Sequence, residues 1–198
     1  MATNVASQAP APVAKPLGSD LVIGKAGEHG HTGNMAMLFG NGTGGFTMDK
    51  IGFSAFQSHE VAAGDLNKDG EDDVVVVASG GQVYVGLGGF SDGLQYSDLA
   101  PAGAFVEVAP FCCDRTGQLH LGDLNDDGKL DIAVTMWGKL GVMLGNGDGT
   151  FGAPILSSAL GFDIRGMALG DLDGDTKVDL VANYAAGNWS LGFHKGNG

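Results

Sequence analysis

The stretch Asp65-Leu-Asn-Lys-Asp-Gly-Glu-Asp-Asp73 decides the fold, because its pattern occurs three times in the chain. It returns as Asp123-Leu-Asn-Asp-Asp-Gly-Lys-Leu-Asp131 and as Asp171-Leu-Asp-Gly-Asp-Thr-Lys-Val-Asp179. Side chains with oxygen atoms stand at positions 1, 3, 5 and 9 of each nine-residue loop. A hard cation such as calcium takes about six to eight oxygens from a compact loop. The pattern therefore predicts three cation sites and, because it recurs, a repeat architecture.

The composition is that of an acidic, glycine-rich chain. Its 198 residues include 10 Lys and Arg against 23 Asp and Glu, for a net charge of -13. Such a chain repels phosphate backbones and anionic lipid surfaces, which argues against nucleic acid or an anionic membrane surface as a partner. The 36 glycines indicate many short strands joined by tight turns. No apolar run approaches the roughly 18 residues of a membrane span.

Each acidic loop belongs to a longer unit. An apolar approach ending in Gly-Asp-Leu precedes the loop, as in Val61–Leu66, and a short apolar run follows it, as in Val74–Ala78. An alternating segment ending in glycine comes next, and its final glycines are expected at Gly88, Gly145 and Gly192. The loops are spaced 58 and 48 residues apart. Units of this length with four short strands predict the antiparallel blades of a β-propeller.

The domain boundaries follow from aligning these units. Residues 1–19 are rich in Ala and Pro, show no visible signal peptide and are expected to form a flexible tail. The repeats are expected over 20–198, with a partial blade at 20–57 and blades at about 58–115, 116–163 and 164–198. About three and a half blades would leave open sheet edges at both ends. We therefore expect a homo-oligomer, in which two copies close one ring, or a larger propeller of which this chain is part.

The combined pattern resembles the FG-GAP/VCBS repeat family, the unit of integrin-α-like propellers. Phe151-Gly-Ala-Pro154 is close to the motif that names the family, and the acidic loops match its calcium loop. The resemblance implies an all-β propeller of four-stranded antiparallel blades that is stabilised by about three calcium ions. It also implies an extracellular or cell-surface protein that binds glycans or proteins and has no general catalytic role.

In each loop the side chains at positions 1, 3, 5 and 9 would hold the ion, together with the carbonyl at position 7. Gly70 and Gly128 stand at position 6, where the chain must turn sharply. Thr176 replaces them in the third loop at a strain of about 1 kcal/mol or more, while Asp173 adds a carboxylate there. The sequence leaves open whether charge or strain dominates. The predicted ligands are Asp65, Asn67, Asp69, Glu71, Asp73, Asp123, Asn125, Asp127, Lys129, Asp131, Asp171, Asp173, Asp175, Lys177 and Asp179.

Two other interpretations of the loops are less favoured. An EF-hand needs a Glu at position 12 and flanking helices, but Val76, Val134 and Ala182 stand there in strand-like runs. Turn hydrogen bonds alone would explain one acidic loop, yet three loops in register make that explanation weaker.

Adjacent cysteines and a histidine pair are further candidates. Cys112 and Cys113 form either a vicinal disulfide or two free thiols, and an oxidising compartment would favour the disulfide. His29 and His31 would suit a transition metal, but their glycine-rich context favours a solvated turn.

Three classes of function are compatible with these features. Trp137 and Trp189 are expected to pack between blades, with sugar stacking or protein contact as the alternative. No catalytic triad order, phosphate loop or isolated carboxylate pair stands out, so the favoured function is a calcium-dependent binding or adhesion module, lectin-like if the ligand is a glycan. The alternatives are a polysaccharide-active propeller enzyme or enzyme subunit, and a purely structural self-assembling repeat protein.

Overall fold

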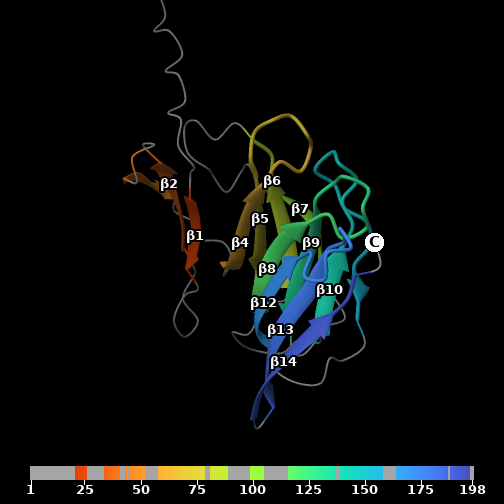
Figure 1. Ribbon diagram of the computed structural model, residues 1–198. Coiled ribbons are helices and arrows are strands. Elements are labelled where there is room, and N and C mark those ends of the chain that lie inside the picture. The colour runs from red at the N-terminus through yellow and green to blue at the C-terminus, as the bar shows by residue number, and fades with distance from the viewer. Residues whose placement is uncertain are drawn as a thin grey trace, which may run out of the picture.

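The computed structural model describes residues 21–25, 34–40, 43, 45–51, 58–78, 81–88, 99–104, 116–136, 139–157, 164–186 and 188–196. Fourteen strands lie in these segments and form four antiparallel sheets (Figure 1). The tail at 1–19, His29, His31, Cys112, Cys113 and Trp137 lie outside the described residues. The described part of the chain contains no helix that is long and apolar enough to cross a membrane.

Strands that follow one another in the chain pair with one another in every sheet. The first sheet contains β1 (Leu21–Lys25), β2 (Asn34–Gly40) and β3 (Phe46–Ile51). The second contains β4 (Ser58–Gly64), β5 (Asp73–Ala78), β6 (Gln82–Gly86) and β7 (Leu99–Ala104). The third contains β8 (Thr116–Gly122), β9 (Asp131–Met136), β10 (Lys139–Met143) and β11 (Ile155–Leu156). The fourth contains β12 (Ile164–Gly170), β13 (Asp179–Ala186) and β14 (Asn188–His194).

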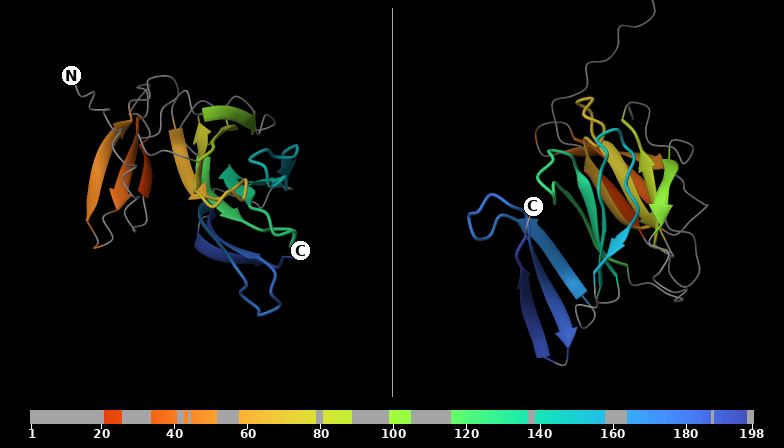
Figure 2. Two further views of the ribbon diagram at one scale, coloured as in Figure 1. Left: turned by 90° about the horizontal axis from the view of Figure 1, so that it is seen from above. Right: turned by 90° about the vertical axis from the view of Figure 1, so that its right-hand side faces the viewer.

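The sheets stand side by side in chain order (Figure 2). Edge strand β1 contacts β4, β4 contacts β8, and β8 contacts β12, so these strands connect the sheets. This arrangement confirms the predicted all-β class with antiparallel propeller-type blades. In the described part of the chain, two sheets have three strands rather than four. By the repeat alignment, β1 to β3 correspond to the second to fourth strands of a blade, and β12 to β14 to the first three.

The core lies between the faces of neighbouring sheets. Strand β5 is buried along its whole length, so both faces of this strand are covered. Val75 and Val77 belong to a cluster with Ile132 and Val134 of β9, which joins the second sheet to the third. A second cluster, in which Ala133 meets the fourth sheet at Leu180, joins the third sheet to the fourth. Each fully buried valine or leucine contributes about 1.5–3 kcal/mol, so stacking of the sheets stabilises the fold.

Candidate metal centres

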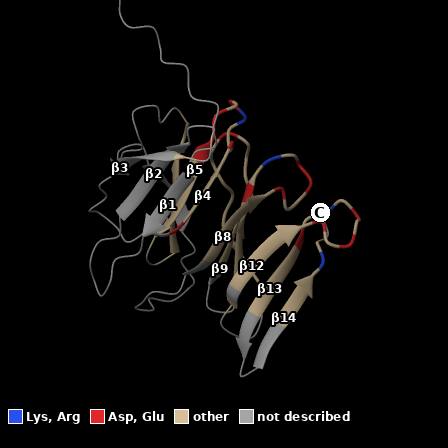
Figure 3. Cartoon of the chain, turned by 60° about the vertical axis from the view of Figure 1, so that its left-hand side comes forward, with Lys and Arg blue, Asp and Glu red and all other residues tan. Residues whose placement is uncertain are grey.

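The three acidic loops connect the first and second strands of consecutive sheets. Residues 65–72 join β4 to β5, residues 123–130 join β8 to β9, and residues 171–178 join β12 to β13. Figure 3 shows the Asp and Glu positions of these loops gathered at one end of the sheets. The repeat thus places its acidic loops at the same end of consecutive sheets.

The aspartate at position 9 anchors each loop to the sheet. Asp73, Asp131 and Asp179 are 0% exposed, and each carboxylate accepts two backbone N–H groups. One donor is the residue at position 2, and the other is a glycine just beyond the third strand of the sheet. The donor pairs are Leu66 and Gly88 for Asp73 (2.8 and 2.6 Å), Leu124 and Gly145 for Asp131 (2.8 and 2.8 Å), and Leu172 and Gly196 for Asp179 (2.9 and 2.8 Å).

The second donor must be glycine in at least two repeats. A Cβ atom on Gly145 would lie 2.1 Å from the carbonyl oxygen of Leu130, and one on Gly196 would lie 2.1 Å from that of Val178. The prediction of Gly192 as the final glycine of the third unit was wrong, since Gly196 donates to the aspartate at position 9. The β13–β14 hairpin is longer than its counterparts, and Gly192 is still inside the ladder, opposite Ala182.

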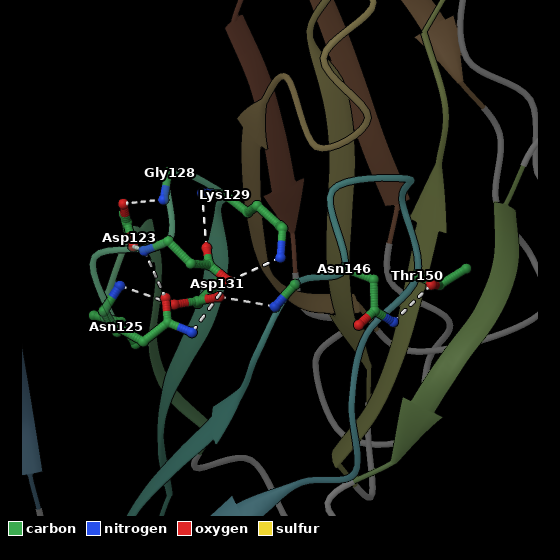
Figure 4. Close-up of polar contacts among 10 residues, drawn as sticks. Asp123, Asn125, Gly128, Lys129, Asp131, Asn146 and Thr150 are labelled. Atoms are coloured by element: carbon green, nitrogen blue, oxygen red, sulfur yellow. Dashed lines mark hydrogen bonds and ion pairs between the residues drawn. The ribbon is translucent and has the colours of Figure 1, made fainter. Parts of the chain in front are cut away.

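The side chains at positions 1, 3 and 5 accept hydrogen bonds from the loop itself (Figure 4). In the second loop, Asp123 accepts the N–H groups of Asp127 (3.0 Å) and Gly128 (2.7 Å). Asn125 also accepts the N–H of Asp127, at 3.2 Å, and Asp127 accepts that of Lys129, at 2.9 Å. The first loop repeats these four bonds around Asp65, Asn67 and Asp69. In the third loop Asp171 accepts from Gly174 and Thr176, Asp173 from Asp175, and Asp175 from Lys177.

The predicted ligands at position 7 take part through their backbone nitrogen. Glu71, Lys129 and Lys177 each donate an N–H to the aspartate at position 5 of the same loop, at 2.8, 2.9 and 2.9 Å. Their role as carbonyl ligands stays a prediction.

Two positions of each loop adopt a left-handed backbone. The φ angle is positive at positions 4 and 6, which are Lys68 and Gly70, Asp126 and Gly128, and Gly174 and Thr176. The third loop therefore moves its glycine from position 6 to position 4. Thr176 has φ of 72°, a conformation that strains a β-branched residue. Since Gly174 carries the other left-handed position, each loop keeps one glycine and one strained residue.

Burial works against the charge of two aspartates, Asp73 and Asp131. Burial is the largest influence on the pKa of Asp73 and of Asp131 and raises both, although the backbone N–H groups that each carboxylate accepts oppose the shift. A cation beside these carboxylates would favour their ionised form.

Among the described residues, one group of three carboxylates converges closely enough to share an ion. One oxygen each of Asp171, Asp173 and Asp179 lie within 4.8 Å of one another. Oxygens that bind one calcium ion at about 2.3–2.6 Å are at most about 5 Å apart, so the donor set fits that ion in chemistry and spacing. The first two loops share the scaffold but place an amide, Asn67 or Asn125, at position 3.

Among the described residues, Lys129 and Lys195 form ion pairs with carboxylates of the acidic loops. The Nζ atom of Lys129 lies 2.9 Å from Asp127 Oδ2, and this contact is the main reason that the pKa of Asp127 is lowered. The Nζ atom of Lys195 lies 2.6 Å from Asp173 Oδ2 and 3.0 Å from Asp175 Oδ2. The sequence analysis missed Lys195, because it stands 22 residues from Asp173 in the chain.

Comparisons with known proteins agree with the repeats. Residues 59–86 match the FG-GAP repeat family, and residues 123–182 match the FG-GAP-like repeat family. No curated protein matches the sequence. Among solved structures, a lectin of Agrocybe aegerita that recognises non-reducing terminal N-acetylglucosamine is similar over 83% of this chain and 47% of its own, with a TM-score of 0.54 and 19% identity. The chain thus spans about half the length of that lectin, and at this identity the likeness concerns the fold alone.

Proposed function

Because the chain carries FG-GAP repeats on propeller-type sheets, we propose that it is a calcium-stabilised binding module whose ligand is a carbohydrate. The observation that carries the calcium part is the convergence of Asp171, Asp173 and Asp179 within 4.8 Å, on a hydrogen-bond scaffold that the other two loops share. Calcium would neutralise carboxylates that otherwise repel one another in a small loop.

The loop residues have separate tasks in this proposal. The aspartates at positions 1 and 5 and the Asn or Asp at position 3 present oxygens that the loop backbone already orients. The aspartate at position 9 ties the loop to the sheet through its two backbone donors, and each of its oxygens has a second lone pair for an ion. The backbone arrangement thus needs no rebuilding when an ion binds.

The carbohydrate part rests on fold likeness. The Agrocybe aegerita lectin, whose fold is similar, recognises non-reducing terminal N-acetylglucosamine. A glycan array with excess calcium, repeated with excess chelator, tests this part of the proposal. Calcium-dependent retention of a glycan supports it. Hydrolysis of a retained polysaccharide would favour the enzyme alternative, and no retention under either condition would overturn the lectin-like function.

The calcium part has a matched pair of variants. Asp127→Asn removes a carboxylate at position 5, whereas Asp126→Asn makes the same change one residue earlier, at the exposed position 4. Calorimetric titration should show about three ions for the unaltered protein and for Asp126→Asn, and one fewer for Asp127→Asn. Excess chelator at neutral pH should lower the melting temperature. Equal stoichiometry in the two variants, or a melting temperature insensitive to chelator, would contradict bound structural calcium.

We also propose that two copies associate through the open face of the last sheet. On β14, Leu191 is 77% exposed and Phe193 is 50% exposed. Phe193 pairs with Val181 of β13. Val181 is equivalent in the repeat to Val75 of β5, which packs against the next sheet. A second copy would continue this stacking. Light scattering should give a dimer that Phe193→Lys dissociates, and a monomeric mass for the unaltered protein at micromolar concentration would exclude the dimer.

The proposed place of action is outside the cell or at its surface. Extracellular calcium modules work with dissociation constants of about 10⁻⁴–10⁻³ M, which suits exposed loops such as these. Dissociation constants in the nanomolar range would point instead to a cytosolic calcium-binding role.

A further inference from the structure

The third repeat differs from the other two at the residue that precedes the closing glycine. Gly88, Gly145 and Gly196 occupy equivalent places, because each donates its N–H to the aspartate at position 9. The residues before them are Leu87, Leu144 and Lys195. The same repeat replaces the asparagine at position 3 with Asp173. At these two positions the third repeat therefore carries one negative and one positive charge where the other repeats carry none.

These two charges meet in the structure. Lys195 Nζ contacts Asp173 Oδ2 at 2.6 Å and Asp175 Oδ2 at 3.0 Å, so the ammonium bridges positions 3 and 5 of the loop. Asp173 is also one of the three converging carboxylates. The ammonium thus bonds to two of the groups that an ion would need.

The backbone holds this lysine beside the loop while leaving its side chain free to move. Gly196 is bonded to the buried Asp179, and the contact with the Val178 carbonyl leaves no room for a Cβ there, so the stem of residue 195 starts from a defined place. The side chain of Lys195 is 54% exposed. Its four-carbon stem can swing into water when another cation arrives.

We propose that Lys195 is a tethered cation that competes with calcium for the third acidic loop, an inference that rests on the calcium function proposed above. Without calcium, the ammonium offsets the charge of Asp173 and Asp175 and keeps the loop ordered. When calcium binds, the ammonium must leave both carboxylates, so the third loop binds the ion more weakly than its four carboxylates alone would.

The other two loops lack this arrangement. Leu87 and Leu144 carry no charge. Lys129 contacts only the Asp127 carboxylate among the described residues, and it does so from within the second loop. The inference therefore predicts that the loop with the most carboxylates at positions 1, 3, 5 and 9 has the weakest calcium affinity of the three.

A single-site titration tests the inference. In a background with Asp69→Ala and Asp127→Ala, the third loop is the site left for calorimetry to report. Lys195→Leu restores the residue type of the other repeats and should tighten the calcium dissociation constant about tenfold or more. Lys139→Leu, which makes the same charge change on β10, should leave it within about twofold.

A melting experiment in the unaltered background provides a second readout. Lys195→Leu should melt lower than the unaltered protein in chelator and should gain more from added calcium. If Lys195→Leu leaves the calcium dissociation constant of the third loop unchanged or raises it, the competition is overturned. Calcium binding by the first two loops would still stand. Absence of calcium binding in the unaltered protein would overturn the proposed function and the inference together.

Discussion

Replacing Gly145 with alanine would place a methyl carbon 2.1 Å from the carbonyl oxygen of Leu130, closer than any non-bonded contact permits. The segment after β10 would have to move, and the N–H of residue 145 would leave the carboxylate of Asp131. Asp131 is 0% exposed, so it would lose one of two backbone donors with no water to replace it. A hydrogen bond to a charged group contributes about 1.5–3 kcal/mol, and displacement of the backbone adds to that cost.

We therefore expect Gly145→Ala to lower the free energy of unfolding by about 3 kcal/mol or more. In a chain of this size that corresponds to a fall in melting temperature of roughly 6–12 °C. Urea denaturation followed by circular dichroism measures the first quantity, and a thermal scan the second. Gly152→Ala is the matched control, because its Cβ would meet the Leu144 oxygen at an ordinary 3.6 Å. If both variants lose the same stability, the aspartate–glycine link does not hold the loop as described.

Three further predictions concern stability. Thr176→Gly should raise the free energy of unfolding by up to about 1 kcal/mol in urea denaturation because it relieves a left-handed threonine, and Gly174→Thr should lower it; the reverse order would contradict the strain. Val134→Ala, in the cluster between the second and third sheets, should cost about 2 kcal/mol, whereas Ile155→Ala at 55% exposure should cost much less; similar losses would argue against that core. Burial raises the pKa of Glu60, so its ionisation opposes folding, and the unaltered protein should lose stability relative to Glu60→Gln as the pH rises through and just above the ordinary range of a glutamate. Melting temperatures of both proteins between pH 3 and 8 would measure this, and a difference that does not change with pH would refute it.

The sequence predicted the elements that local pattern encodes. The acidic loops, the apolar approach to each loop and the buried run of β5 rest on side chains within about ten residues, and the sheets form where these patterns indicated them. The left-handed position 4 went unnoticed because Lys68 and Asp126 are not glycines. Only the comparison with Gly174 in the third loop would have revealed it.

Long-range contacts account for the remaining differences between the sequence-based predictions and the structure. Gly196 was not identified as the closing glycine because the longer β13–β14 hairpin moves it four residues beyond Gly192, the glycine that ends the alternating segment. Lys195 reaches Asp173 only after that hairpin has returned the chain to the loop. Both residues would have been found by aligning the second and third units on Gly-Asn-Gly, which occurs at 145–147 and again at 196–198.

The link between a buried aspartate and its glycine closes a hairpin of variable length. The two partners are 15 residues apart in the first linked repeat, 14 in the second and 17 in the third, yet the distances hardly change. The tips of these hairpins lie at the opposite end of each sheet from the acidic loops. Insertions at the tips can therefore diversify one end of the molecule, in nature or by grafting, while the acidic end keeps its geometry.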